Sequence, residues 1–202
     1  MSKFVGWAAV ALLAAGCTEV GVSRNAPLPI APIGVETAAP IVQNLTFDLQ
    51  SVQVVVPASL RVSESNSYYP TNVEIVWRGD PIGDRHAQIA EIFETAGARA
   101  AAADTTGDVP VIAQIQLTRF HGVTERTRYS VGGVYNMQFL ITLRHAQTGD
   151  ILVGPYPAVA DLAAPGGNAA VQLDRIGQTE KVRVTDFLSQ WLATQLDASV
   201  PL

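Results

Sequence analysis

The sequence predicts an α+β fold, a single two-layer sandwich in which an antiparallel sheet of about five strands carries two helices on one face. Two observations lead to this prediction. Several segments alternate apolar with polar residues, the pattern of strands with one buried and one wetter face, as in antiparallel sheets. Two longer segments repeat apolar residues at helical spacing. The order is strand, strand, helix, three strands, helix, and packing both helices on the apolar face is the economical arrangement.

The predicted domain covers residues 45–202 and opens with a strand over 45–56. The apolar residues of this strand change parity near Gln50 and Ser51. Because a shift of one residue exchanges the two faces of a strand, this change predicts a β-bulge. A polar loop follows, and a second, short strand is predicted over 73–77 from its alternating apolar residues.

A helix is predicted next, from about Pro81 or Asp84 to Ala102. Asp80 is a good N-cap residue, and proline is favoured at the first position of a helix. The segment then repeats apolar residues with a helical period, which predicts that one side of the helix is buried. This expected apolar stripe consists of Ile89, Ile92, Phe93, Ala96 and Ala100.

Three further strands are predicted after this helix. The segments 111–118 and 137–144 both alternate apolar and polar residues, so each should have one buried face. A glycine-containing hairpin then leads into a last strand that starts at 151–153. Pro155 and Pro157 should weaken this strand to an edge or a bend, because proline cannot donate to a ladder.

The chain closes with a helix predicted over at least 179–196. Its large apolar residues fall at helical spacing on one side, which is typical of a core-facing helix and not of a cofactor site. The expected core residues are Val184, Phe187, Leu188, Trp191, Leu192 and Leu196.

Residues 1–16 have the layout of a bacterial secretory signal peptide. Lys3 supplies the positive start, an apolar run follows over 4–15, and small residues precede Cys17. The run is about 12 residues long, whereas a helical membrane span needs about 20. We therefore predict a removable signal and not a transmembrane helix.

The stretch from Leu13 to Cys17 resembles the lipobox of bacterial lipoproteins. The resemblance implies that the signal is cut before Cys17 and that Cys17 carries the lipid that holds the protein in a membrane. Thr18, in place of aspartate, implies sorting to the inner leaflet of the outer membrane, with the domain in the periplasm. This sequence departs from the family pattern at Ala14, where leucine is preferred. The alternative is a secreted protein with an incidental cysteine.

After Cys17, residues 18–44 are rich in proline, alanine and valine and show neither helical nor strand periodicity. We interpret 17–44 as the lipidated cysteine and a tether that can reach about 80 Å in an extended, polyproline-like state. The alternative is that apolar residues of this segment dock on the domain or on a partner. Those residues are Ile30, Ile33, Ile41 and Val42.

The composition excludes several classes of function. The formal net charge is −5 and the sequence has no basic run, which disfavours nucleic-acid binding. Cys17 is the only cysteine, so an internal disulfide framework is excluded. His86, His121 and His145 lack the spacing of metal ligands, and no phosphate or dinucleotide motif is present. We expect neither a metal nor a cofactor.

Two polar patches are candidate surfaces for a partner. In the first patch, two arginines would contact anions of a partner and a tryptophan would serve as an apolar anchor. The alternative is that these residues have only structural roles, in a tight turn, a capped helix and Arg–Asp pairs. The second lies beside a glycine turn, and its alternative is a solvated hairpin tip. The first patch comprises Trp77, Arg78, Asp80, Asp84, Arg85 and His86, and the second comprises Arg126, Arg128 and Tyr129.

The stretches 56–60, 68–70 and 75–86 resemble a group of uncharacterised alphaproteobacterial lipoproteins. The resemblance covers most of the chain after residue 45 and brings no activity with it. In architecture alone, the order of strands and helices is also similar to that of small periplasmic accessory lipoproteins of outer-membrane assembly and lipid transport. A fold shared in this way does not imply a function.

Two hypotheses of function follow. The first is a non-enzymatic envelope lipoprotein, attached to the membrane through Cys17, that binds a protein or lipid partner in an assembly or transport role. The second is an envelope hydrolase that acts on a carbohydrate or peptidoglycan-like substrate through Asp80, Asp84 or Glu91. A hydrolase of this kind needs two carboxyl groups that converge in a cleft. We find no catalytic constellation in the sequence and predict that the protein is not an enzyme.

Overall fold

The computed structural model describes residues 46–103 and 107–197. The chain divides into two compact units, 1–40 and 41–202, and all described residues belong to the second. The predicted signal peptide, Cys17 and the predicted tether lie outside the described residues. Within the described part of the chain, no helix combines the length and the apolar character that a membrane crossing requires.

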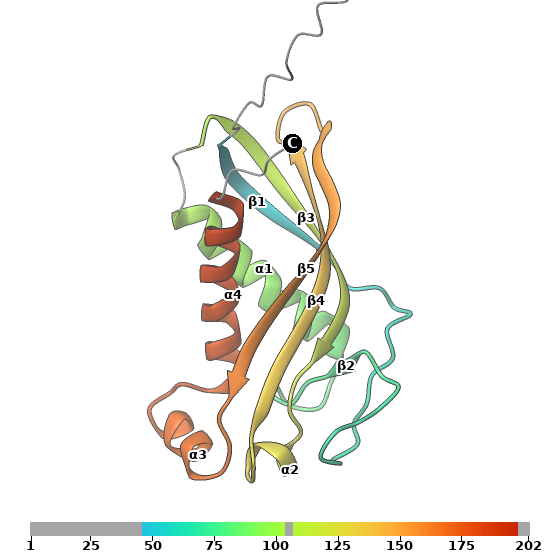
Figure 1. Cartoon of the computed structure of the whole chain (residues 1–202), viewed down its shortest axis with the longest axis vertical. Coiled ribbons are helices and arrows are strands. Elements are labelled where there is room, and N and C mark those ends of the chain that lie inside the picture. The colour runs from blue at the N-terminus through green and yellow to red at the C-terminus, as the bar shows by residue number, and fades with distance from the viewer. Residues whose placement is uncertain (1–45, 104–106, 198–202) are drawn as a thin grey trace, which may run out of the picture. The chain divides into compact units, whose positions relative to one another are not determined.

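The centre of the domain is a five-stranded sheet (Figure 1). Four long strands lie in the order β1-β3-β4-β5, and a short β2 pairs with the end of β3. A register shift between Leu49 and Ser51 of β1 confirms the predicted bulge. The strands are β1 (Phe47–Val55), β2 (Ile75–Val76), β3 (Val109–His121), β4 (Gly133–His145) and β5 (Ile151–Ala164).

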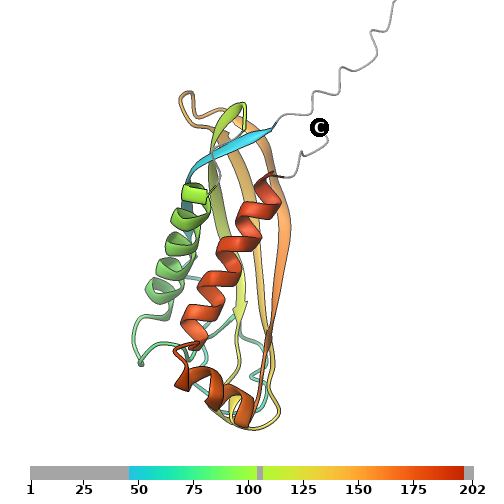
Figure 2. The ribbon, with the colours of Figure 1, turned by 90° about the vertical axis from the view of Figure 1, so that its left-hand side faces the viewer.

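Two long helices, α1 (Arg85–Ala103) and α4 (Glu180–Asp197), pack side by side on one face of the sheet (Figure 2). This arrangement confirms the predicted α+β class. Two short helices were not predicted: α2 (Glu125–Arg128) precedes β4, and α3 (Asn168–Arg175) precedes α4. α2 has four residues and none of them is apolar, and α3 has only eight residues, which is shorter than the window in which a helical period can be recognised.

The sheet is mixed, which corrects the prediction of a purely antiparallel sheet. β1 and β2 both run parallel to β3, while β4 and β5 are antiparallel to their neighbours. A parallel pair needs a long crossover connection, and α1 with the segment before it supplies one between β1 and β3. Alternation of apolar residues is typical of antiparallel sheets because one of their faces is often exposed. In this sheet the long helices cover one face only, so β3 alternates although two of its neighbours are parallel to it.

β5 is longer than predicted, because it continues through both prolines to Ala164. It pairs only with β4 among the described strands and is therefore an edge of the sheet. A proline on an edge strand can turn the side that lacks a donor toward solvent, so it does not end the strand.

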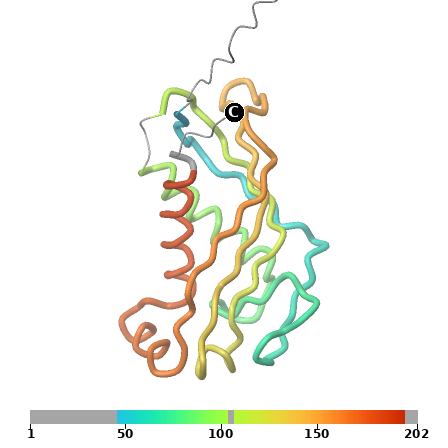
Figure 3. Tube along the Cα trace, viewed as in Figure 1, coloured from blue at the N-terminus to red at the C-terminus, as the bar shows by residue number. Residues whose placement is uncertain are grey.

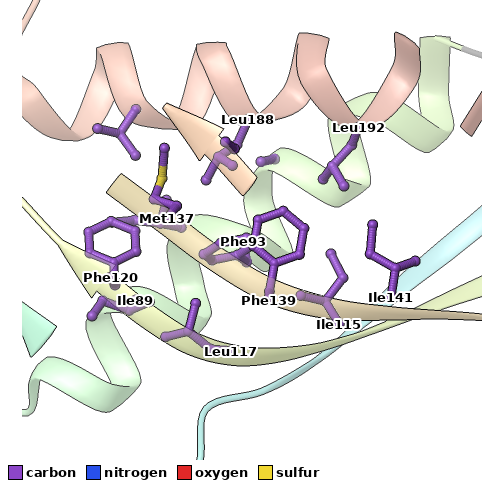
Figure 4. Close-up of a cluster of buried hydrophobic side chains, with 14 of the residues drawn as sticks. Ile89, Phe93, Ile115, Leu117, Phe120, Met137, Phe139, Ile141, Leu188 and Leu192 are labelled. Carbon is purple, nitrogen blue, oxygen red and sulfur yellow. The ribbon is translucent and has the colours of Figure 1, made fainter. Parts of the chain in front are cut away.

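The core lies between the sheet and the two long helices (Figure 4). Phe93 of α1 and Phe139 of β4 meet edge to face, with ring centroids 5.4 Å apart. Gly97 lets α1 approach β1 closely, since a Cβ at this position would lie 2.4 Å from the Cβ of Val52. Most of the predicted core residues, including Val184, are buried. Phe187 and Trp191 are partly buried against the core, and the side chain of Leu196 lies outside the described residues.

Candidate binding site

Residues 57–74, which we call the anchored loop, connect β1 to β2 and lie on the right of the sheet in Figure 3, with α4 on the left. Side chains of neighbouring elements bind the backbone carbonyls of this loop. Thr124, the N-cap of α2, donates from Oγ1 to the carbonyl of Ser67 at 2.8 Å, and Thr127 Oγ1 donates to that of Tyr68 at 2.6 Å. These bonds offset the entropy that an ordered loop loses.

Two arginines with buried side chains also hold this loop. Arg78 donates to the carbonyl of Ser63 at 3.1 Å and pairs with the carboxylate of Glu64 at 3.1 Å. Arg85 is 3% exposed and also binds Glu64, through both Nε and Nη2. The Glu64 carboxylate is itself partly exposed, so solvent screens both ion pairs, and the bonds that the two guanidinium groups make to backbone carbonyls add to the hold on the chain. Both arginines therefore fasten the loop to the domain.

The anchored loop presents two tyrosines to solvent. Tyr68 is 54% exposed and Tyr69 is 63% exposed. The guanidinium of Arg126 lies 4.7 Å from the ring centroid of Tyr68, within the range of a cation–π interaction. The hydroxyl of Tyr69 accepts from Arg119 at 3.0 Å, and its ring lies 4.7 Å from that of His121. Both rings are therefore exposed and held in place.

A pocket of about 480 Å³ opens beside these tyrosines, at the end of the sheet where β4 begins and β5 ends. Tyr135 and Met137 face the core, so the intervening Asn136 faces the side of the sheet opposite α1 and α4. Volumes of about 300–1,000 Å³ are typical of small-molecule sites. The pocket is lined by Tyr68, Tyr69, His121, Gly122, Val123, Thr127, Val131, Gly132, Gly133, Val134, Asn136 and Asp161.

Besides the two tyrosines, the polar side chains in this pocket are those of His121, Thr127, Asn136 and Asp161. His121 is 3% exposed, and its Nε2 lies 3.0 Å from the carbonyl of Pro70. A carbonyl can only accept, so Nε2 carries the proton and Nδ1 is an acceptor. Burial lowers the pKa of His121 and keeps the ring neutral near pH 7. Asp161 accepts from Asn136 Nδ2 at 2.7 Å and supplies the only formal charge among the lining residues.

A second cluster of charges ties α2 to α3 and α4. Arg128 pairs with Asp174 of α3 at 2.5 Å and with Glu180 of α4 at 2.6 Å. Glu180 also accepts a hydrogen bond from the hydroxyl of Tyr135 in β4. Burial raises the pKa of Glu180, although the bonds from Tyr135 and Arg128 oppose the shift. The cluster is satisfied internally and holds the short helices against the domain.

The structure separates the residues of the first predicted patch. Trp77 lies in the core at 0% exposure, and its Nε1 donates to Asp80 at 2.8 Å, so it is not a surface anchor. Arg78 and Arg85 are buried against carboxylates and carbonyls and do not form an anion-binding surface. This corrects the partner-surface interpretation for these three residues. Trp77 is in the core because burying its large ring is favourable. The two arginines can be buried because their charges are paired with carboxylates and carbonyls.

The remaining predicted residues lie nearer the surface, with one exception. Asp84 is exposed and accepts from the backbone N–H of Ala87 at the start of α1, and His86 Nε2 lies 3.1 Å from the carbonyl of Leu60. In the second patch, Arg126 and Tyr129 are exposed. Arg128 is the exception, because it is buried in the cluster with Asp174 and Glu180 and is not available to a partner.

The carboxylates of the hydrolase hypothesis do not line the pocket. Asp80 and Glu91 both bind Lys181 of α4, at 3.0 and 2.9 Å. Asp84 caps the first turn of α1. These contacts give each of the three carboxylates a structural role. In 46–103 and 107–197, no group of three or more His, Cys, Asp or Glu residues is placed to hold a metal ion.

Sequence reasoning missed the pocket, because its residues come from segments that are far apart in the sequence, between Tyr68 and Asp161. One signal was available in the sequence. Tyr68 and Tyr69 are adjacent aromatic residues inside a polar loop, where a core role is not expected. The structure adds that Gly132 adopts a φ of 72° and that a Cβ there would lie 2.4 Å from the carbonyl oxygen of Ala164, so the turn beside the pocket requires glycine.

The fold and the site together define a small α+β domain with an aromatic-rimmed pocket on the open face of its sheet. The chain belongs to DUF6778, a family of unknown function, which matches residues 47–201. This confirms the prediction of an uncharacterised family. No curated protein matches the chain significantly.

Two solved structures show a weak likeness. A DUF330 family protein from Xanthomonas campestris is 12% identical with a TM-score of 0.40, covering 79% of this chain and 86% of its own. A minor lipoprotein from Acinetobacter baumannii is 10% identical with a TM-score of 0.30, covering 74% of this chain and 93% of its own. Likenesses at this level carry no inference about function.

Proposed function

We propose that this protein is a lipoprotein of the bacterial cell envelope whose domain binds a partner without catalysing a reaction. In this proposal the lipid on Cys17 anchors it in the inner leaflet of the outer membrane, and the domain faces the periplasm in an accessory role in envelope assembly or transport. The signal-like segment and the lipobox-like stretch before Cys17 support the location. The binding role rests on a separate observation in the domain.

That observation is the pocket beside the anchored loop. Exposed aromatic side chains that are already ordered are effective anchors for a partner, because little entropy is lost when they bind. Tyr69 meets this condition, since Arg119 and His121 fix its hydroxyl and its ring while 63% of the residue remains exposed. Val131 adds an apolar surface at the same pocket and is 78% exposed.

Site-specific photo-crosslinking in intact cells tests the binding role. A photoreactive amino acid at Val131 should form a discrete adduct that mass spectrometry identifies. The matched control is Ile151, an exposed apolar residue of the same sheet. Ile151 is the first residue of β5, and Ala164, the last residue of β5, pairs with Gly133 of the pocket. The control position therefore lies about 40 Å from the pocket along the strand. Equal adducts at both positions, or none at Val131, would contradict the proposal.

The hydrolase hypothesis finds no support in the site. Asp161 is the only carboxylate among the residues that line the pocket, whereas the two-carboxylate mechanism needs a pair. Asp80 and Glu91 share Lys181, and both carboxylates are engaged by that ammonium. We therefore propose a binding function and do not carry the hydrolase hypothesis further.

A further inference from the structure

The chemistry of the pocket limits what it can bind. Its lining contains one formal negative charge, on Asp161, and no lysine or arginine. The guanidinium groups nearby are engaged with the tyrosines: Arg126 lies against the ring of Tyr68, and Arg119 donates to the hydroxyl of Tyr69. The charge inside the pocket therefore favours a cation over an anion.

Two acceptor atoms in the lining have no partner among the described residues. Asp161 Oδ1 accepts from Asn136, while no bond is found for Oδ2. His121 donates from Nε2 to Pro70, which leaves Nδ1 as an unprotonated acceptor in a residue that is only 3% exposed. Asp161 is exposed, so its second oxygen is open to solvent and to the charge of a ligand. The buried Nδ1 of His121 is costly without a hydrogen bond, so a ligand that brings N–H donors is favoured at this place.

The rest of the lining is suited to an apolar or aromatic body. Val123, Val131 and Val134 contribute aliphatic surface, and the rings of Tyr68 and Tyr69 stand at the rim. Aromatic faces also attract ammonium groups, because the ring quadrupole places negative charge on the faces. Apolar side chains, aromatic rings and an unpaired carboxylate oxygen thus occur together in one cavity of about 480 Å³.

We propose that this pocket binds a small amphiphile with an apolar or aromatic body and a protonated amine as its head group. The amine lies toward Asp161 and His121, and the body lies on the valines and tyrosines. This inference rests on the proposed binding function and adds the chemical class of the ligand. It concerns a small molecule, so it is separate from the adducts that crosslinking in cells detects.

Three probes with the same ring and different heads test the inference: benzylammonium, benzyl alcohol and benzoate. The full chain carrying Cys17→Ser is titrated with each probe, and affinities come from NMR shifts of residues that line the pocket. Benzylammonium should bind most tightly, about fivefold more tightly than benzyl alcohol, because one charge contact or cation–π contact at a partly exposed site is worth about 1 kcal/mol. Benzoate should bind most weakly, because its carboxylate meets that of Asp161.

Variants of the protein distinguish the contribution of the amine head group to the affinity from that of the apolar body. Asp161→Asn should reduce the affinity for benzylammonium to that for benzyl alcohol and leave the latter unchanged. Val134→Ser should weaken all three probes, because it removes apolar surface that they share. Asp150→Asn is the matched control, since this exposed carboxylate lies in the hairpin between β4 and β5, at the opposite end of the sheet, and should change none of the affinities.

The inference is overturned if benzoate binds most tightly, which would mean that Arg119 and Arg126 govern recognition. It is also overturned if Asp161→Asn has no effect on benzylammonium, or if no probe shifts the lining residues. In each of these outcomes an adduct at Val131 in cells would still support the proposed binding function. If no adduct forms at Val131 but the pocket still prefers benzylammonium, the proposed partner binding is contradicted and the inference about the ligand stands.

Discussion

The hydroxyl of Tyr135 donates to the buried carboxylate of Glu180, which also pairs with Arg128. Tyr135→Phe removes one donor from a buried charge and should destabilise the domain by about 1–3 kcal/mol. Chemical denaturation measures the change in the free energy of unfolding. Tyr129→Phe is the matched control, because Tyr129 is exposed and should change stability by less than about 0.5 kcal/mol. Equal effects of the two variants would show that the hydroxyl of Tyr135 has no special role.

Glu74 pairs with Arg61 at one end of the anchored loop. The hydrogen bonds from Arg61 lower the pKa of Glu74 from 4.5 to about 2. Because the folded pKa lies below the unfolded one, the pair stabilises the domain above pH 4.5 and its contribution disappears as the pH falls toward 2. The melting temperature of Glu74→Gln should therefore lie below that of the wild type at pH 6 and converge with it in acid. A difference that stays constant over this range would contradict the account.

At the scale of single elements, Trp191 tests how α4 is held to the sheet. It is partly buried against the core, and its ring lies 5.3 Å from that of Phe139, edge to face. Trp191→Ala should destabilise the domain by about 3 kcal/mol, the lower end of the range for large aromatic truncations, because part of the ring remains exposed. Chemical denaturation measures this change. A loss below about 1 kcal/mol would mean that the contact with Phe139 contributes little.

The elements were largely predictable because local patterns determine them. The change of parity at Gln50 and Ser51 predicted the bulge of β1, and the helical spacing of apolar residues predicted α1 and α4. The direction of β1 was not predictable, since it depends on how the crossover through α1 packs. The length of β5 was underestimated, because the cost of a proline depends on whether the strand lies at an edge.

The candidate site was much less predictable than the elements, because it depends on contacts between distant segments. Trp77, Arg78 and Arg85 looked like a recognition surface in the sequence, yet burial and ion pairing give them structural roles. In contrast, Tyr69 and Asp161 are 92 positions apart in the sequence and line one pocket. No periodic pattern in a single sequence reports such a pairing.

For the whole molecule, the anchor is tested at Cys17. Cys17→Ser removes the sulfur that a lipid would modify, so the variant should keep its signal peptide or appear as a soluble form without acyl chains. Membrane fractionation and intact-mass measurement distinguish these results. A variant that loses its signal normally and still stays with membranes after a high-salt wash would contradict lipid anchoring.

The central claim is that the domain binds its partner through the pocket beside the anchored loop. The most direct measurement is the amount of adduct formed from Val131 in intact cells, compared between the wild type and Tyr69→Ala at equal levels of folded protein. Tyr69 is 63% exposed, so its truncation should leave the fold stable while removing an aromatic anchor. We predict that the adduct at Val131 is lost or strongly reduced in Tyr69→Ala. An adduct of unchanged identity and amount would contradict the claim.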